Sequence, residues 1–209
     1  MDAWQMTDSE RSAFADLADS LTPVQWDQPS LCDGWKVRDV VAHVIDGADV
    51  KMGRMMLTAV KYGFRMNVMN QREAQKAGAK PTDELCQELR ATVGVHKAPG
   101  PIKPEDMVLE TIVHEQDVRR PLGIARAYPA DEMKIALERA TLQGSAFLPI
   151  KKRIADVKLK ATDVDWEHGE GSEVSGPGEA LLMAMAGRPV ALAELSGPGL
   201  DTLEQRIGS

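Results

Sequence analysis

The segment 110-ETIVHEQD-117 decides how this chain can fold, because it sets metal-binding side chains into a run of apolar residues. Glu110 and His114 are four residues apart, a spacing that puts both side chains on one face of a helix. Asp117 continues that face and can accept a hydrogen bond from a nearby histidine ring. Read with the distant His43, the segment predicts a site in which His43, Glu110 and His114 surround one divalent metal.

The segment lies within a helix that we predict from Pro104 to about residue 120. Proline suits the first helical position, and the ring of Pro121 is expected to end the helix. Apolar side chains flank the polar stripe at positions Leu109, Ile112, Val113 and Val118. A carboxylate and an imidazole on an inward stripe are costly as packing elements, so the pattern favours a binding role.

His43 falls within a second predicted helix, which runs from Lys36 to about Tyr62 and carries a stripe of valines, isoleucine and methionines. An imidazole among valines can be a core histidine with satisfied nitrogens or a metal ligand. The Glu110–His114 pair also has two interpretations, because Glu and His at this spacing can bind a metal or form an exposed ion pair. Only the two motifs together favour a metal.

Other parts of the N-terminal region are predicted from local signals. A capping-box spacing from Thr7 to Glu10 predicts a first helix over residues 8–21. The polar segment 63–81 is the best candidate for a mobile cover over the site. A third helix begins at residue 82 and ends near His96, which we expect to be exposed.

The period of the apolar pattern changes after residue 150. Val157, Leu159 and Ala161 alternate with polar residues, which is typical of a strand, and a helix is expected after Pro177. The fold class predicted is mainly α, with a metal-binding helical bundle at 1–150 and a small α+β domain at 151–209.

Composition narrows the functional classes. The chain has 209 residues, 43% of them hydrophobic, and a formal net charge of −7. The acidic balance argues against a nucleic-acid partner, and the absence of a long apolar run or a signal-like N-terminus predicts a cytoplasmic protein with no membrane partner. Cys32 and Cys86 have no paired spacing and are expected to be free thiols. The basic cluster 151–153 can be a solvated helix end or an anion site.

Three segments together resemble a known family. They are 31-LCDGWKVRDVVAHVIDGAD-49, 110-ETIVHEQDVRRPLG-123 and 161-ATDVDWEHGEGSEVSGPGEALLMAMAGRP-189. In this order they are similar to the mycothiol-dependent maleylpyruvate isomerase family of the DinB-like metalloprotein superfamily. The similarity spans most of the chain, and the family is functionally diverse.

The resemblance implies a DinB-like four-helix bundle followed by a small α+β C-terminal domain. It implies a divalent metal, usually zinc, held by a histidine of the second helix and a Glu-x-x-x-His pair of a later one. His43 matches the histidine, and Glu110 and His114 match the pair. It also implies mycothiol as a thiol cofactor, with Arg188 as the match to an arginine that binds it.

Such a site would act on a small electrophilic molecule. A thiol bound to the metal loses its proton at neutral pH and becomes a nucleophile. Its addition to an alkene, followed by rotation and elimination, would make an isomerase, and addition alone would make an S-transferase. A non-catalytic small-ligand or metal-binding protein and a metal-dependent hydrolase remain alternatives, and the sequence is compatible with a homodimer.

Overall fold

The computed structural model describes residues 1–98, 102–144 and 148–207. Its contacts divide the chain into two compact units, Met1–Ala125 and Arg126–Ser209, each of which is described by itself. Among the described residues, no helix is long and apolar enough to cross a membrane. Both cysteines are free thiols, as predicted.

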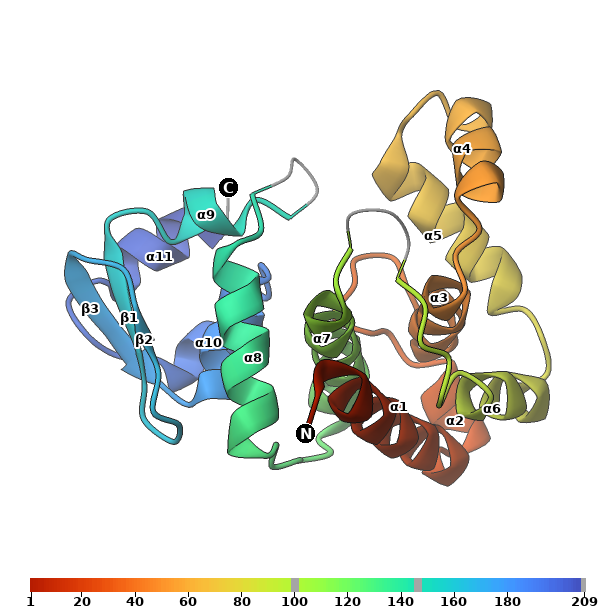
Figure 1. The fold of residues 1–209 in the computed structure, drawn as a ribbon, viewed down its shortest axis with the longest axis horizontal. Coiled ribbons are helices and arrows are strands. Elements are labelled where there is room, and N and C mark those ends of the chain that lie inside the picture. Colours follow the sequence, from red (N-terminus) through yellow and green to blue (C-terminus); the bar gives the residue numbers. More distant parts are fainter. Residues whose placement is uncertain (99–101, 145–147, 208–209) are drawn as a thin grey trace. The chain divides into compact units, whose positions relative to one another are not determined.

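The described residues of the first unit form helices joined by loops. Its helices are α1 (Ala3–Ser20), α2 (Pro23–Trp26), α3 (Val37–Ala48), α4 (Met52–Lys61), α5 (Met66–Ala77), α6 (Thr82–Arg90) and α7 (Pro104–Leu122). Helices α1, α3, α6 and α7 form the four-helix bundle, in which α1 contacts α6 and α7, and α3 contacts the same two helices (Figure 1). The predicted bundle is therefore confirmed.

Apolar burial explains why these four helices associate. Phe14 of α1, Val40 of α3 and Leu85 of α6 are completely buried in one cluster, which Val118 of α7 joins. Each fully buried side chain of this size stabilises the fold by about 1.5–3 kcal/mol relative to an exposed one. The bundle is thus held by the apolar faces of helices that lie far apart in the sequence.

Two helix boundaries differ from the sequence prediction. Helix α1 begins earlier than predicted, because Asp2 caps it in a capping box with Gln5. The expected cap, Thr7, instead lies inside the helix and is buried. The predicted helix from Lys36 to Tyr62 is broken into α3 and α4 at Asp49, whose backbone leaves the helical region with φ −134° and ψ 51°.

Helix α7 passes through Pro121 and ends only at Gly123, which has a left-handed φ of 66°. The prediction that Pro121 ends the helix was wrong, because a proline in the last turn removes a single helical hydrogen bond. That bond would have run from residue 121 to the carbonyl of Asp117. The Asp117 carbonyl instead accepts a hydrogen bond from the backbone N–H of Leu31, at 3.0 Å.

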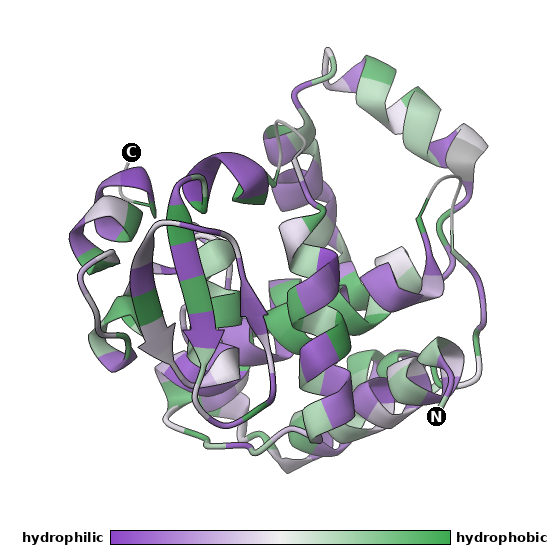
Figure 2. Cartoon of the chain, turned by 60° about the vertical axis from the view of Figure 1, so that its left-hand side comes forward, coloured by the Kyte–Doolittle hydropathy of each residue, from purple (hydrophilic) through white to green (hydrophobic). Residues whose placement is uncertain are grey.

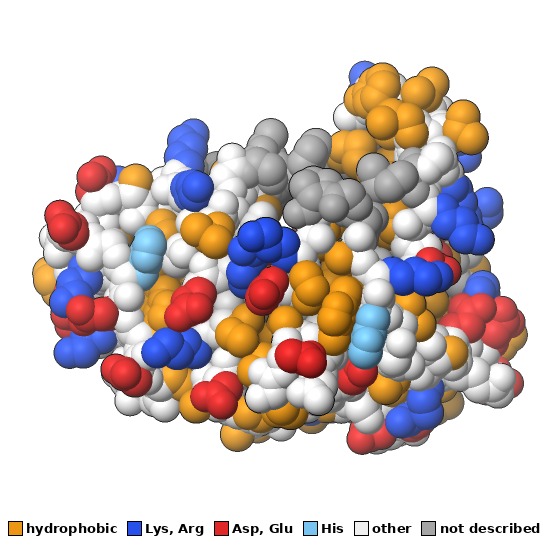
Figure 3. Space-filling view, viewed as in Figure 1, with side chains coloured by type: hydrophobic (Ala, Val, Ile, Leu, Met, Phe, Trp, Pro, Cys, Tyr) orange, Lys and Arg blue, Asp and Glu red, His pale blue; other side chains and the backbone are white. Residues whose placement is uncertain are grey.

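The segment 63–81 contains helix α5, which packs along α3. Helix α4 contacts α5, and apolar side chains gather on the exposed surface of this helix pair (Figure 3). Leu57 and Phe64 are among the exposed apolar residues there.

The second unit combines helices with a small sheet. Its elements are α8 (Ala130–Thr141), α9 (Ile150–Arg153), β1 (Val157–Ala161), β2 (Glu167–His168), β3 (Ser172–Gly176), α10 (Gly178–Met185), the 3-10 helix η1 (Pro189–Glu194) and α11 (Leu200–Ile207). The strand order is β2-β1-β3, with β1 antiparallel to β2 and parallel to β3. Alternate residues of β1 are buried, in the pattern that Figure 2 shows as alternating hydropathy.

The contacts divide the chain at residue 125 and not near 150, where the change of apolar period had suggested a boundary. The difference concerns α8, which packs on α10 and so joins the second unit. Gly178 makes this close packing possible, because a Cβ there would meet Met133 at 3.0 Å and Leu137 at 3.3 Å. A helical pattern alone does not show against which neighbour a helix packs.

Replacement of Leu89 by alanine tests the bundle core. Leu89 is completely buried in α6, so Leu89→Ala should lower the free energy of unfolding by about 2–5 kcal/mol. The same change at Leu57, whose exposed fraction is 75%, should change it by less than about 0.5 kcal/mol. Urea unfolding followed by circular dichroism measures both, and equal effects would contradict the assignment of the core.

Candidate metal site

The structure brings together the three side chains that the sequence had singled out. His43 comes from α3, and Glu110 and His114 come from α7, which packs against α3. One ligand atom from each of the three lies within 4.8 Å of the others, and His43 Nε2 is 3.9 Å from Glu110 Oε1. Ligand atoms about 2.1 Å from a tetrahedral zinc ion lie about 3.4 Å apart from one another. The three ligand atoms would therefore need to move only slightly closer together to bind such an ion.

The three side chains are partly exposed. The exposed fractions are 25% for His43, 32% for Glu110 and 16% for His114. A catalytic metal needs three protein ligands and one position open to a further ligand. Their partial exposure leaves room for that position.

Aromatic packing fixes the direction of both imidazole rings. The His43 and His114 rings meet edge to face with centroids 5.0 Å apart. His43 also meets the Trp35 ring edge to face, with centroids 5.1 Å apart. Trp35 therefore anchors a site residue.

The two histidines have opposite electrostatic surroundings. Burial, aided by the nearby His114, lowers the pKa of His43 to about 3, so its ring is neutral and keeps a lone pair for a metal. Burial also acts to lower the pKa of His114, but the hydrogen bonds with Asp117 and Cys32 outweigh it and raise the pKa to about 10. In the metal-free protein His114 is therefore an imidazolium at neutral pH.

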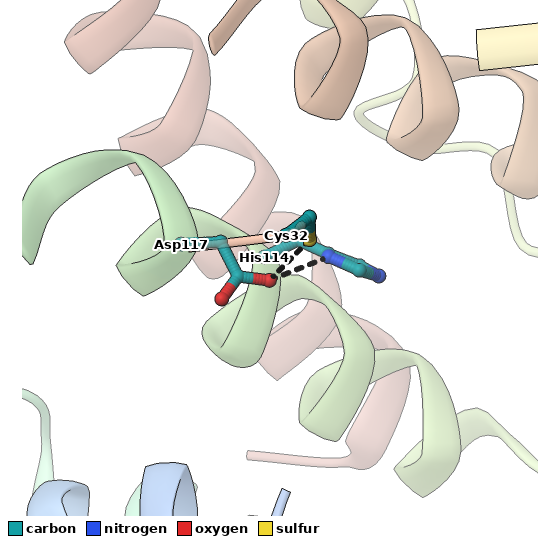
Figure 4. Close-up of side chains that lie close together, drawn as sticks. All are labelled: Cys32, His114 and Asp117. Atoms are coloured by element: carbon teal, nitrogen blue, oxygen red, sulfur yellow. Dashed lines mark hydrogen bonds and ion pairs between the residues drawn. The ribbon is translucent and has the colours of Figure 1, made fainter. Parts of the chain in front are cut away.

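Asp117 lies where the sequence predicted an acceptor for a histidine ring. His114 Nδ1–H donates to Asp117 Oδ2 at 3.1 Å, and the Asp117 side chain is fully buried. With Nδ1 engaged in this way, Nε2 is the nitrogen left to bind a metal. The thiol of Cys32 donates to the same Oδ2, also at 3.1 Å (Figure 4).

Two residues that sequence reasoning missed surround Glu110. Gly47 leaves room for the carboxylate, since a Cβ at this position would lie 3.2 Å from Glu110 Oε1. The buried guanidinium of Arg11 donates to the carbonyls of Thr92 and Val95, and it interacts electrostatically with Glu110. The only sequence signal for Gly47 was its position one helical turn after His43.

A cavity of about 470 Å³ opens beside the three candidate ligands and includes His43 and Glu110 in its wall. This volume is typical of a small-molecule site. Helix α5 contributes to it, which gives the segment 63–81 a place at the site. Four methionines line it, together with charged residues that include Lys51 and Arg54; the methionines are Met55, Met66, Met69 and Met107.

Two other predicted residues are not part of this group. His96 is exposed, as expected, and it pairs with Asp8 at 2.8 Å and stacks on Trp4. Arg188 belongs to the second unit, where its Nη1 donates to the carbonyl of Ala186 at 2.7 Å. Its proposed contact with a thiol cofactor remains a prediction.

The fold and the side-chain cluster define a protein with a four-helix bundle, followed by a small α+β unit, and with a group of residues suited to one metal. Comparison with family models agrees, since residues 7–98 match the model described as the mycothiol maleylpyruvate isomerase N-terminal domain. The resemblance inferred from the sequence is confirmed over this part of the chain. A comparison with curated proteins gives no match.

Solved structures show the same fold. The crystal structure of the mycothiol-dependent maleylpyruvate isomerase is 13% identical, with a TM-score of 0.60, and the match covers 94% of this chain and 91% of that one. The crystal structure of a histidine-to-alanine mutant of that isomerase gives the same TM-score and coverage at 12% identity. The match extends over both units, and at this identity it establishes the fold alone.

Nuclear magnetic resonance of the metal-free protein tests the two protonation states. Ring nitrogen shifts should show His114 as an imidazolium and His43 as a neutral imidazole at pH 7, because their pKa values lie at about 10 and about 3. Asp117→Asn removes the partner charge, so it should lower the pKa of His114. A neutral His114 ring in the unaltered protein at pH 7 would contradict the raised pKa of His114.

Proposed function

We propose that this protein is a mycothiol-dependent metalloenzyme that adds a thiol to a small electrophile at a metal held by His43, Glu110 and His114. The observation that carries the proposal is the convergence of these three side chains from two helices at the edge of a cavity. The family match of residues 7–98 supports the choice of thiol cofactor.

The donor set suits zinc, which takes imidazole nitrogen and carboxylate oxygen in catalytic sites. When bound, the ion would supply a positive charge that lowers the pKa of a thiol ligand and so provides a thiolate at neutral pH. The protein side chains would prepare the site. His43 offers a neutral ring, Asp117 holds Nδ1–H of His114, and Glu110 contributes a negative charge beside both rings.

The cavity supports an electrophile with an apolar portion. Methionine side chains are flexible and polarisable, so a wall rich in them adapts to ligands of different shape. Isomerisation and S-transfer share the addition step and differ in whether the thiol is eliminated afterwards. The proposal covers both, includes Arg188 as a cofactor-binding residue, needs no nucleic-acid partner and is compatible with a homodimer.

Metal analysis is the first test. Protein purified without chelator should hold about one zinc per chain, and His43→Gln, Glu110→Gln and His114→Gln should each weaken zinc affinity by more than about 100-fold, since loss of a supporting residue alone costs 10–100-fold. The exposed His96 provides the matched control, because His96→Gln should leave the affinity unchanged. Equal zinc affinity in all four variants would rule the proposed ligands out.

The affinity for zinc should also depend on pH in a defined direction. Because the pKa of His114 is raised to about 10, a metal must displace one proton from this ring at any lower pH. His43 is already neutral above about pH 3 and adds no further proton. Affinity should therefore rise about tenfold per pH unit between about pH 6 and 8, and competition with a chromophoric chelator measures it.

Measurements of thiol binding and turnover distinguish the proposed function from a hydrolase and from a non-catalytic binding protein. In calorimetry the metal-loaded protein should bind mycothiol, the metal-free protein should not, and Arg188→Ala should weaken binding by about tenfold, as expected for a lost charged hydrogen bond. Turnover of a maleyl-type substrate or a thiol-reactive alkene should require mycothiol. Thiol-independent hydrolysis would favour a hydrolase, and binding without turnover would favour a non-catalytic protein.

A further inference from the structure

The loop between α2 and α3 is a rigid element beside the candidate metal site. Backbone hydrogen bonds close it across its base, from Val37 N–H to the Gln28 carbonyl and from Ser30 N–H to the Trp35 carbonyl, at 3.0 and 2.9 Å. A tighter turn inside it runs from Trp35 N–H to the Cys32 carbonyl at 3.0 Å. The backbone of this loop is therefore restrained both at its base and within it.

Two hydrogen bonds attach the loop to Asp117 of α7. Leu31 N–H donates to the Asp117 carbonyl, which is available because Pro121 has no N–H to offer it. The neighbouring Cys32 thiol donates to Asp117 Oδ2. The backbone and the side chain of Asp117 are thus both fixed by consecutive residues of the loop.

Asp117 Oδ2 transmits this constraint to the site, because it also accepts the hydrogen bond of His114 Nδ1 (Figure 4). A carboxylate turns about its last torsion, and a second donor on the same oxygen limits that rotation. At the other end of the loop, Trp35 contacts the ring of His43. One loop therefore supports both candidate histidine ligands.

We propose that Cys32 is a positioning residue whose thiol orients Asp117, and through it His114, so that Nε2 of His114 points toward His43 and Glu110. This inference rests on the proposed metal site and deepens it. Cys32 acts here as a hydrogen-bond donor to Asp117, and the proposal assigns it no role as nucleophile or ligand.

A competing arrangement uses the same atoms. Cys32, His114 and Asp117 also offer ligand atoms within 4.8 Å of one another and could themselves hold a metal. That arrangement would use Nδ1 of His114 and so replace its hydrogen bond to Asp117, whereas coordination through Nε2 keeps that bond. The geometry therefore favours a supporting role for Cys32, and the experiment includes the competing arrangement as an outcome.

The test compares Cys32→Ala, which removes the donor, with Cys32→Ser, which keeps one. Zinc affinity is measured in the full-length protein with a phosphine reductant and no added thiol. Cys32→Ala should weaken it by about tenfold, the lower end of the effect of losing a supporting residue, and Cys32→Ser should stay within about threefold of the unaltered protein.

Cys86 provides a matched control. It is also a partly buried free thiol, and it also has a hydrogen bond with an aspartate, Asp19, but it lies on α6 outside the site. Cys86→Ala and Cys86→Ser should leave zinc affinity unchanged. A similar loss in Cys86→Ala and Cys32→Ala would show a general effect on folding and would overturn the proposal.

A second measurement does not depend on zinc. In the metal-free protein, the Nδ1–H resonance of His114 should shift or broaden in Cys32→Ala and recover in Cys32→Ser. An unchanged resonance overturns the positioning role, and so does equal zinc affinity in Cys32→Ala and the unaltered protein. If the unaltered protein binds no zinc, the proposed function fails, while this resonance still decides the role of Cys32.

Cobalt substitution decides between support and coordination. The cobalt protein without added thiol should lack a thiolate-to-cobalt charge-transfer band, because the three expected ligands contain no sulfur. A band that disappears in Cys32→Ala would make Cys32 a ligand and would overturn its assignment as a positioning residue.

Discussion

The hydrogen bond from His114 to the buried Asp117 carboxylate is the constraint on which the site depends. It holds one imidazole nitrogen and leaves the other free to face His43 and Glu110. A buried carboxylate is stable only with such partners, and Asp117 has two donors on one oxygen. The bond therefore satisfies a buried charge and directs a candidate ligand at once.

The bundle supplies the rigidity that this arrangement needs. Two of the three candidate ligands lie one helical turn apart on α7, so their separation is set by helix geometry. The third comes from α3, and its position depends on the packing of α3 against α7. Small residues contribute as well, since Gly47 allows the Glu110 carboxylate to approach α3.

Pro121 illustrates how a local rule can have a tertiary consequence. A proline in the last turn of a helix leaves one carbonyl without a helical donor. In this chain that carbonyl belongs to Asp117, and Leu31, a loop residue 86 positions earlier, supplies the missing N–H. The departure from ideal helix geometry thus becomes the attachment point of the loop that borders the site.

The sequence by itself determined the helices, the small α+β part and the face that joins Glu110, His114 and Asp117, because helical and strand periods are local properties of the chain. The four-helix arrangement was implied by the family resemblance. The sequence also indicated His43, through a resemblance that residues 7–98 confirm. Only the tertiary structure decided that α8 joins the second unit, that α4 separates from α3, and that Cys32 meets Asp117. These features depend on contacts between residues distant in sequence, and such contacts leave no periodic pattern from which they could be predicted.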